Sequence, residues 1–241
     1  MLKFDLLNST NTEAINQAKC GADEGVCVVA TEQTSGRGRH GRSWISPKDS
    51  GLYFSIVLRP KIETRFLPLL TLMTSVAVFE VLKELYNLQP DIKWSNDILI
   101  NEKKISGILA ETAETNKGLA VIVGIGINLN SKNFPAELSK TATSIEQETN
   151  QKADYDELLN SLTRFFNYFY GIFQDENGAE KIRQEWKRRS TYFSGKNVRV
   201  ILKNEIIYGT TCGLEENGAL KVKTKNGELK IIQAGDVERL R

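Results

Sequence analysis

The pattern of apolar residues changes near Phe193, and no other feature of this 241-residue chain restricts the possible folds as strongly. Before this point, segments with helical spacing alternate with β-branched, strand-like segments. After it, only short strand-like segments follow, separated by Asn217-Gly218 and Asn226-Gly227, which are typical hairpin turns. We therefore predict two domains, a larger α+β domain over residues 1–191 and a small all-β domain over residues 192–241.

The larger domain is predicted to form a mixed or antiparallel sheet packed by helices. Strands are expected at residues 2–7, 25–31, 52–58, 91–100, 104–113 and 118–127, and helices at residues 66–86, 155–173 and 179–190. A further helix should begin after Ser9, with Thr10 as its cap and Glu13 reaching back to complete a capping box. Residues 101–103 should form a hairpin turn. In the small domain, strands at residues 197–203, 206–213, 219–224 and 228–233 resemble an SH3-like barrel.

The charge balance and the cysteine count disfavour several classes of protein. The 32 basic and 30 acidic side chains give a net charge of +2, whereas a dedicated nucleic-acid binder usually has a strong basic excess. Three cysteines without a CxxC pair predict neither a disulfide framework nor a zinc site, and the single histidine, His40, leaves little material for a histidine-based site. Because neither a basic leader nor a long apolar run is present, we expect a cytoplasmic protein without membrane attachment.

Residues 33–44, Gln-Thr-Ser-Gly-Arg-Gly-Arg-His-Gly-Arg-Ser-Trp, are a glycine-rich segment with three arginines. Residues 36–41 match the dinucleotide-binding pattern G-x-G-x-x-G, but that pattern requires a helix directly afterwards, and the sequence that follows disfavours one. Guanidinium groups pair with phosphate or carboxylate oxygens, and Trp44 offers a surface on which a base can stack. The segment is therefore a candidate for closing over a nucleotide, with a solvated basic loop or a nucleic-acid contact as the alternative.

Lysines interrupt two strand-like segments that are otherwise apolar, residues 93–97 and residues 104–111. A lysine directed into a half-buried sheet is costly unless it meets an anion, and the small residues Ser106 and Gly107 leave room for a ligand beside Lys104. The alternative is that Lys104 is an exposed lysine of the hairpin turn, since most lysines are exposed.

A third segment, residues 124–130, places two glycines on one face of a strand. It fails the dinucleotide pattern, because Leu129 stands where the third glycine is required. Glycines in this arrangement indicate either a ligand that passes close to the backbone or a simple bulge before a turn.

Taken together and in this order, these segments resemble the catalytic domain of biotin–protein ligases. The family's Gly-Arg-Gly-Arg-x-Gly-Arg, Lys-Trp-Pro-Asn-Asp and Lys-x-x-Gly-Ile-Leu motifs correspond to residues 36–42, 93–97 and 104–109. Ser95 replaces the usual proline, which affects only the local turn. An early Ser-Thr-Asn and a late Gly-x-Gly-x-Asn also match, at residues 9–11 and 124–128. The resemblance extends over nearly the whole chain and implies a class II synthetase-like catalytic domain followed by a small SH3-like domain.

The resemblance also implies a role for each matching residue. Biotin would be bound by Ser9, Thr10, Asn11, Gln33, Gly36, Arg37, Gly38, Arg39, Lys104 and Gly107. The nucleotide would be bound by Arg39, Arg42, Trp44, Lys93, Asn96 and Asn128. Catalysis would depend on Arg37, Lys93, Asp97 and Lys104, with Lys104 reaching both the biotin carboxylate and the α-phosphate.

The implied activity uses ATP to convert biotin into biotinyl-5′-AMP, with release of pyrophosphate, and then transfers biotin to a lysine of a biotin carboxyl carrier protein, with release of AMP. Fixed cations suit this reaction because negative charge builds up at phosphorus. No enzyme nucleophile and no protein-bound metal site are required, since Mg²⁺ arrives with ATP. A lipoate–protein ligase of the same fold is the nearest alternative, and a non-enzymatic nucleic-acid-binding protein is the second.

Some members of the family carry an N-terminal helix-turn-helix domain. The present sequence starts with the segment that matches the catalytic domain, so we expect a form that lacks a DNA-binding domain and does not bind an operator specifically. An exposed sheet edge would allow two chains to pair, so a homodimer is possible.

Overall fold

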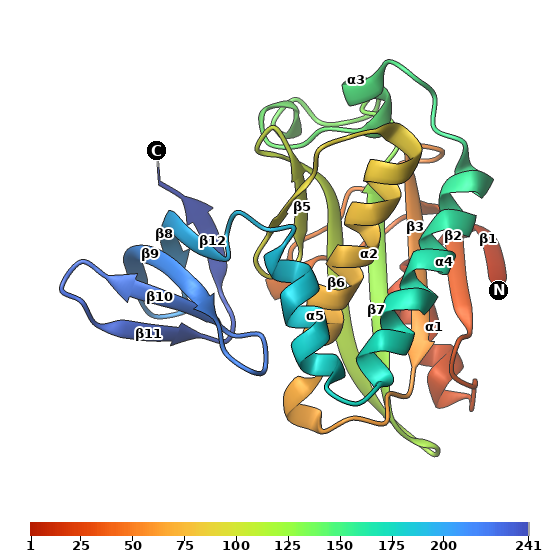
Figure 1. The fold of residues 1–241 in the computed structure, drawn as a ribbon. Coiled ribbons are helices and arrows are strands. Elements are labelled where there is room, and N and C mark those ends of the chain that lie inside the picture. The colour runs from red at the N-terminus through yellow and green to blue at the C-terminus, as the bar shows by residue number, and fades with distance from the viewer. Residues whose placement is uncertain (241) are drawn as a thin grey trace.

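Seven strands form the large sheet, in the order β1-β2-β3-β7-β6-β5-β4 (Figure 1). The structure is a computed structural model that describes residues 1–240. Its large-sheet strands are β1 (Leu2–Leu7), β2 (Cys27–Gln33), β3 (Gly51–Leu58), β4 (Asp91–Lys93), β5 (Asp97–Ile100), β6 (Lys103–Thr115) and β7 (Gly118–Asn128). β1 and β2 pair in parallel, and all other neighbours pair antiparallel. The prediction of a mixed sheet in an α+β fold is therefore confirmed.

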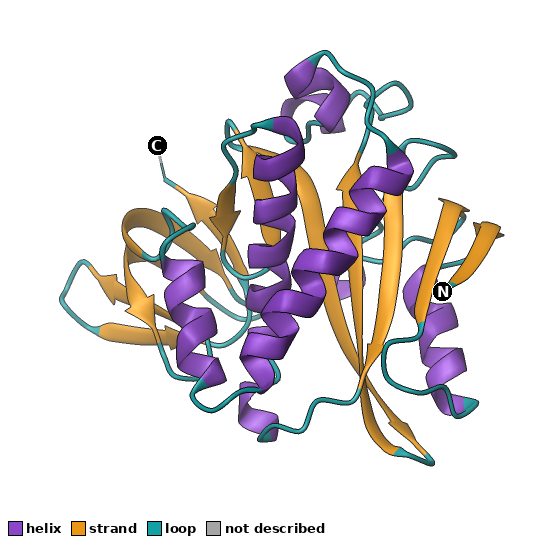
Figure 2. Cartoon of the chain, turned by 45° about the vertical axis from the view of Figure 1, so that its right-hand side comes forward, coloured by secondary structure: helices purple, strands orange, loops and turns teal. Residues whose placement is uncertain are grey.

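Helices cover both faces of this sheet (Figure 2). The helices are α1 (Thr10–Lys19), α2 (Leu69–Tyr86), the short α3 (Ile145–Thr149), α4 (Tyr155–Gln174) and α5 (Gly178–Lys187). α2, α4 and α5 pack together on one face, whereas α1 lies on the other. Phe54 of β3 joins the core under α2, while Val57 of the same strand packs with Ala14 of α1, as the alternation of side chains along a strand requires.

The predicted central helix over residues 66–86 is confirmed as α2, with a later start. Its buried side chains lie on nearly every side of the helix, because it packs against the sheet, α4 and α5 at once. Thr74 and Ser75 are completely buried, and their hydroxyls donate to the backbone carbonyls of Leu70 and Leu72. No helix within residues 1–240 is both long and apolar enough to cross a bilayer.

The last five strands form a separate sheet, in the order β11-β10-β9-β8-β12. They are β8 (Ser194–Ile201), β9 (Ile206–Leu214), β10 (Leu220–Thr224), β11 (Leu229–Ile232) and β12 (Asp236–Arg239). The predicted turns at Asn217-Gly218 and Asn226-Gly227 join β9 to β10 and β10 to β11, and both glycines have φ +85°. This sheet is held against the larger one: the indole N–H of Trp94 donates to the carbonyl of Gly218 over 2.9 Å.

Two local predictions are wrong, and two short elements were not predicted. Ser9, rather than Thr10, caps α1, since its side chain accepts from the backbone N–H of Thr12, whereas the N–H of Thr10 donates to Gln33 over 2.8 Å. Residues 91–100 form two strands instead of one, because residues 94–96 make a turn between them. α3 and β12 are additional elements that the sequence patterns did not predict, because both are too short to show a period.

Candidate active site

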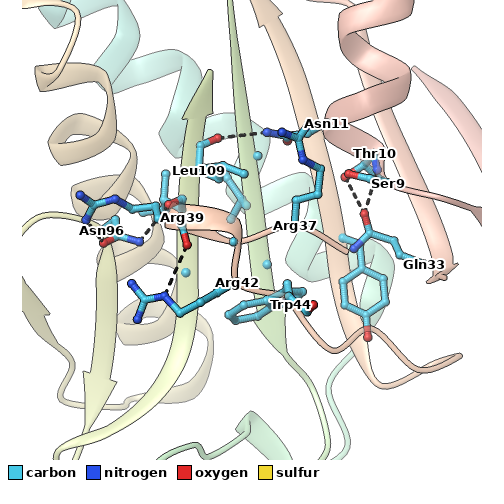
Figure 3. Close-up of a pocket in the computed structure, with 18 of the residues that line it drawn as sticks. Ser9, Thr10, Asn11, Gln33, Arg37, Arg39, Arg42, Trp44, Asn96 and Leu109 are labelled. Carbon is cyan, nitrogen blue, oxygen red and sulfur yellow. Dashed lines mark hydrogen bonds between the residues drawn. The ribbon is translucent and has the colours of Figure 1, made fainter. Parts of the chain in front are cut away.

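Two rows of residues that cross the large sheet on the α1 side form the floor of the candidate site. The first row runs from β3 to β4 through Tyr53, Gly126, Gly107, Asp97 and Lys93. The second consists of Ser55, Gly124 and Leu109. Directly opposed residues on neighbouring strands present their side chains on the same face of the sheet. Both rows therefore face the pocket on the α1 side, except that Lys93 at the end of the first row lines an adjoining cavity. The start of α1 and the loop between β2 and β3 enclose this pocket from above (Figure 3).

Glycine is required in both rows because other groups approach the backbone there. A β-carbon on Gly126 would lie 2.5 Å from the indole of Trp44, and one on Gly124 would lie 2.0 Å from Oδ1 of Asn11. Both distances are far below an ordinary van der Waals contact. For residues 124–130, the structure therefore supports close approach of another group to the backbone rather than a simple bulge.

Polar side chains from α1, β2 and β3 meet at one end of the pocket. Oδ1 of Asn11 lies 2.6 Å from the hydroxyl of Ser55, and this hydroxyl lies 2.8 Å from that of Thr10. Gln33 accepts from Thr10 and donates to the hydroxyl of Ser46 over 2.7 Å. Asn11 and Thr10 are each only 4% exposed, so these contacts fix the positions of the groups that a ligand would meet.

The glycine- and arginine-rich loop folds back on itself as an irregular hairpin over the floor. Gly38 N–H donates to the carbonyl of Arg42 over 2.7 Å, and Trp44 N–H donates to that of Gly36 over 2.8 Å. A β-carbon on Gly36 would lie 2.3 Å from the carbonyl oxygen of Trp44, so this glycine is needed for the hairpin itself. His40 at the tip has the left-handed φ of 55°.

The three arginines of this loop have different partners. Arg37 pairs with Glu111 over 2.7 Å, and Arg42 pairs with Asp236 over 2.6 Å. Arg39 donates instead to two neutral oxygens, Ser95 Oγ at 2.7 Å and Asn96 Oδ1 at 2.8 Å. Burial lowers the pKa of the Arg39 guanidinium, and the more distant carboxylates of Asp236 and Asp97 oppose this effect. Of the three, Arg39 is therefore the cation with the greatest need for an anionic partner.

Lys104 lies at the edge of the floor, between an acidic and an aromatic side chain. Its ammonium is 2.6 Å from Oδ1 of Asp97 and 5.2 Å from the centre of the Trp44 ring. Lys93 approaches the same carboxylate at 4.0 Å. The indole N–H of Trp44 is buried without a hydrogen-bond partner within residues 1–240, so this donor is free to meet an acceptor of a bound molecule.

The pocket brings together most of the residues selected from the sequence. It is lined by Ser9, Thr10, Asn11, Gln33, Arg37, Gly38, Arg39, Arg42, Trp44, Asn96, Asp97, Lys104 and Gly107. Lys93 and Asn128 line an adjoining cavity, which shares Trp44, Asp97 and Lys104 with the first. The side chain of Asn128 is 6% exposed and donates to the carbonyl of Thr143 over 2.9 Å.

The sequence patterns did not identify Tyr53 and Asp236, which line the pocket. They also missed Ser55 and Glu111, which contact the lining residues Asn11 and Arg37. A signal existed for Glu111, because it follows Gly107 and Leu109 at alternate positions of one strand and so shares their face. None existed for Asp236, which meets Arg42 across 194 positions of the chain.

Fold and site together define an α+β protein whose pocket has a polar floor at one end and cations above and beside it, an arrangement that suits a small anionic ligand. Residues 4–128 match the Biotin/lipoate A/B protein ligase family, and residues 193–240 match the Biotin protein ligase C terminal domain. The chain therefore belongs to the biotin protein ligase family. It is 38% identical over 99% of its length to the Bifunctional ligase/repressor BirA of Bacillus subtilis, of which it covers 73%. It is 31% identical over 95% of its length to the Biotin–[acetyl-CoA-carboxylase] ligase of Paracoccus denitrificans, of which it covers 96%.

A solved structure supports the same assignment. The fold matches that of the biotin protein ligase from Aquifex aeolicus in complex with biotin and ATP, with a TM-score of 0.86 and 31% identity. The match covers 100% of this chain and 98% of the other. The similarity thus includes both sheets and the pocket between α1 and the loop.

Proposed function

We propose that this protein activates biotin with ATP and attaches it to a lysine of a biotin carboxyl carrier protein. The carboxylate of biotin attacks the α-phosphorus of ATP, which gives biotinyl-5′-AMP and pyrophosphate. The acceptor lysine then attacks the mixed anhydride, loses a proton and releases AMP. One observation carries this proposal: a single pocket combines the polar groups of Thr10, Asn11 and Gln33 with the cations Lys104 and Arg39. The first set suits a ureido ring, and the second suits a carboxylate and phosphates.

The biotin-binding residues follow from this arrangement. The ureido ring binds on the polar end of the floor, where Ser9, Thr10, Asn11 and Gln33 supply donors and acceptors. The aliphatic chain of biotin runs from this polar end toward Lys104, past the side chains of Asn11 and Trp44 that pack on Gly124 and Gly107. Gly36, Arg37, Gly38 and Arg39 belong to the loop that closes over the bound molecule.

Catalysis depends on cations placed where negative charge develops. Lys104 contacts the biotin carboxylate and the α-phosphate, and its ammonium is positioned by Asp97, which Lys93 also approaches. Arg39 and Arg42 bind phosphate oxygens, Trp44 packs on the adenine ring, and Asn96 and Asn128 contact the nucleotide. Mg²⁺ accompanies ATP and is held by the phosphates and water.

The proposal includes a division of the chain into two domains. Residues 1–191 form the catalytic domain, and residues 192–241 form a small domain of the SH3-like barrel type. The strand pairing supports this division, because the five strands of the second sheet pair only with one another. Asp236 of this domain contacts Arg42 of the loop, so the small domain contributes to closure of the site. Pairing of two chains through a sheet edge stays a prediction that sedimentation can test.

Release of pyrophosphate tests the proposed function directly. The purified protein with Mg-ATP should release pyrophosphate when biotin is added and should not do so with lipoate. Addition of a biotin carboxyl carrier domain should then yield a biotinylated lysine, whereas a carrier in which this lysine is replaced by arginine should stay unmodified. Activity with lipoate in place of biotin, or with neither, would reject the proposal.

Binding of biotinyl-AMP should order the loop over residues 36–44. Most of its side chains are exposed and few apolar groups anchor it, and ordering each residue costs roughly 1–2 kcal/mol. We expect the amide hydrogens of this segment to exchange more slowly when the adenylate is bound, while those of α4 keep their rates. Equal exchange of the loop with and without ligand would contradict the prediction.

Substitution of Gly124 by alanine should weaken biotin binding by about tenfold to a hundredfold. The new β-carbon would lie 2.0 Å from Oδ1 of Asn11, which is held by Ser55 and cannot retreat freely. Titration calorimetry measures the effect. Gly171→Ala is the control, because this exposed glycine has no neighbouring atom within 4 Å of the added carbon. Unchanged affinity of Gly124→Ala would show that the biotin ring binds elsewhere.

A further inference from the structure

Glu111 of β6 connects the loop to the start of α1 through a single carboxylate. Its Oε1 pairs with the guanidinium of Arg37 over 2.7 Å, and its Oε2 accepts from the amide of Asn11 over 2.9 Å. The side chain of Glu111 is 22% exposed, so solvent screens these contacts only in part. Figure 3 shows the side chain of Arg37 extending from the loop to Asn11.

The carboxylate of Glu111 determines the orientation of the Asn11 side-chain amide. An ionised carboxylate accepts hydrogen bonds and donates none, so Asn11 must present its NH₂ group to Glu111. The same NH₂ group donates to the carbonyl of Leu109 over 3.3 Å, and the amide oxygen is then left to face Ser55 at 2.6 Å. Without the charge on Glu111, only the longer hydrogen bond to the carbonyl of Leu109, at 3.3 Å, would favour this orientation of the amide.

These contacts belong to a longer series of polar contacts that begins and ends in the same loop. From Arg37 it passes through Glu111, Asn11, Ser55, Thr10 and Gln33 to Ser46. Arg37 lies near the beginning of the loop and Ser46 near its end, and Gln33 and Ser46 also form a backbone bridge. Closure of the loop and orientation of the polar floor are therefore linked through one set of side chains.

We infer that Glu111 is a positioning residue for biotin: it fixes the Asn11 amide in the orientation that recognises the ring and holds Arg37 over the bound molecule. This inference rests on the proposed function, because it assigns the ureido ring to the floor around Asn11. It also gives Arg37 a role different from that of a phosphate ligand, since its charge is already paired with Glu111.

Glu111→Gln tests this inference, because it keeps the size of the side chain and removes its charge. We expect the KM for biotin to rise by about tenfold to a hundredfold, since hydrogen bonds to a charged group are the strong ones, while the KM for ATP changes little. Residues 36–44 should exchange their amide hydrogens faster in the variant than in the wild type. A residue with a merely structural role would lower the melting temperature and leave the KM for biotin unchanged.

Glu111→Asp provides a second variant in case the first does not fold. It keeps the charge but shortens the side chain by one methylene group, so it cannot reach both Arg37 and Asn11 and should show the same rise in the KM for biotin. Glu114→Gln on the exposed side of the same strand is the control and should behave like the wild type. If both Glu111 variants have a wild-type KM for biotin and wild-type exchange of the loop, the inference is wrong. If the wild type itself releases no pyrophosphate with biotin, the proposed function fails instead.

Discussion

Replacement of Lys104 by alanine should slow the formation of biotinyl-AMP by a factor on the order of a hundred to a thousand. The ammonium of Lys104 contacts both reacting partners in the first step, and negative charge grows on the α-phosphate as the carboxylate attacks. Removing one fixed cation from such a position costs about 3–4 kcal/mol of transition-state stabilisation. Single-turnover measurement of adenylate formation gives the rate directly.

The variant should fold, because the backbone of Lys104 keeps its pairing with Leu99 and Asp97 keeps Lys93 at 4.0 Å. Lys104→Arg should not restore the rate, since a planar guanidinium does not replace a compact ammonium between Asp97 and Trp44.

Lys103→Ala is the matched control for this prediction. The two lysines are neighbours on β6, but only Lys104 lines the main pocket and pairs with Asp97. Lys103 is half-buried and lines the adjoining cavity but not the main pocket. We expect Lys103→Ala to retain adenylate formation within a few-fold of the wild type. A crippled Lys103→Ala beside a nearly normal Lys104→Ala would show that the assignment of this site is off by one residue.

The fold and the residues of the site could be predicted from the sequence to different extents. Periodicity was sufficient for α2, α4 and the longer strands of the large sheet, because each is long enough to show its period. It failed at residues 91–100, where three strand residues before a turn and four after it give the same pattern as one continuous strand. The site motifs were found because lysine and glycine are unusual in apolar strands and because one loop carries three arginines.

The sequence patterns could not predict which side chains the motif residues contact. Nothing in the order of residues indicates that Arg37 meets Glu111 and Arg42 meets Asp236, while Arg39 meets only Ser95 and Asn96. These partners depend on strand register and on how the second sheet packs. They also change the interpretation, because three arginines that look equivalent in the motif differ in how much of their charge is free for a ligand.

The loop arginines therefore give the last prediction: Arg39→Ala should reduce the rate of adenylate formation by a factor on the order of a hundred or more, and Arg42→Ala by less than about tenfold. Arg39 is a half-buried cation bound only to neutral oxygens, so the protein compensates its charge poorly. An arriving phosphate supplies the missing anion. Arg42, in contrast, is 59% exposed and already paired with Asp236.

The two variants should also differ in stability. Removing Arg39 eliminates a half-buried cation whose partners are neutral, so the melting temperature of the protein without ligands should stay the same or rise. The stabilisation that ATP and biotin give the wild type should largely disappear. Arg42→Ala should keep most of this stabilisation. If Arg42→Ala loses more activity and more ligand-induced stabilisation than Arg39→Ala, then the free charge of Arg39 is not what the nucleotide binds.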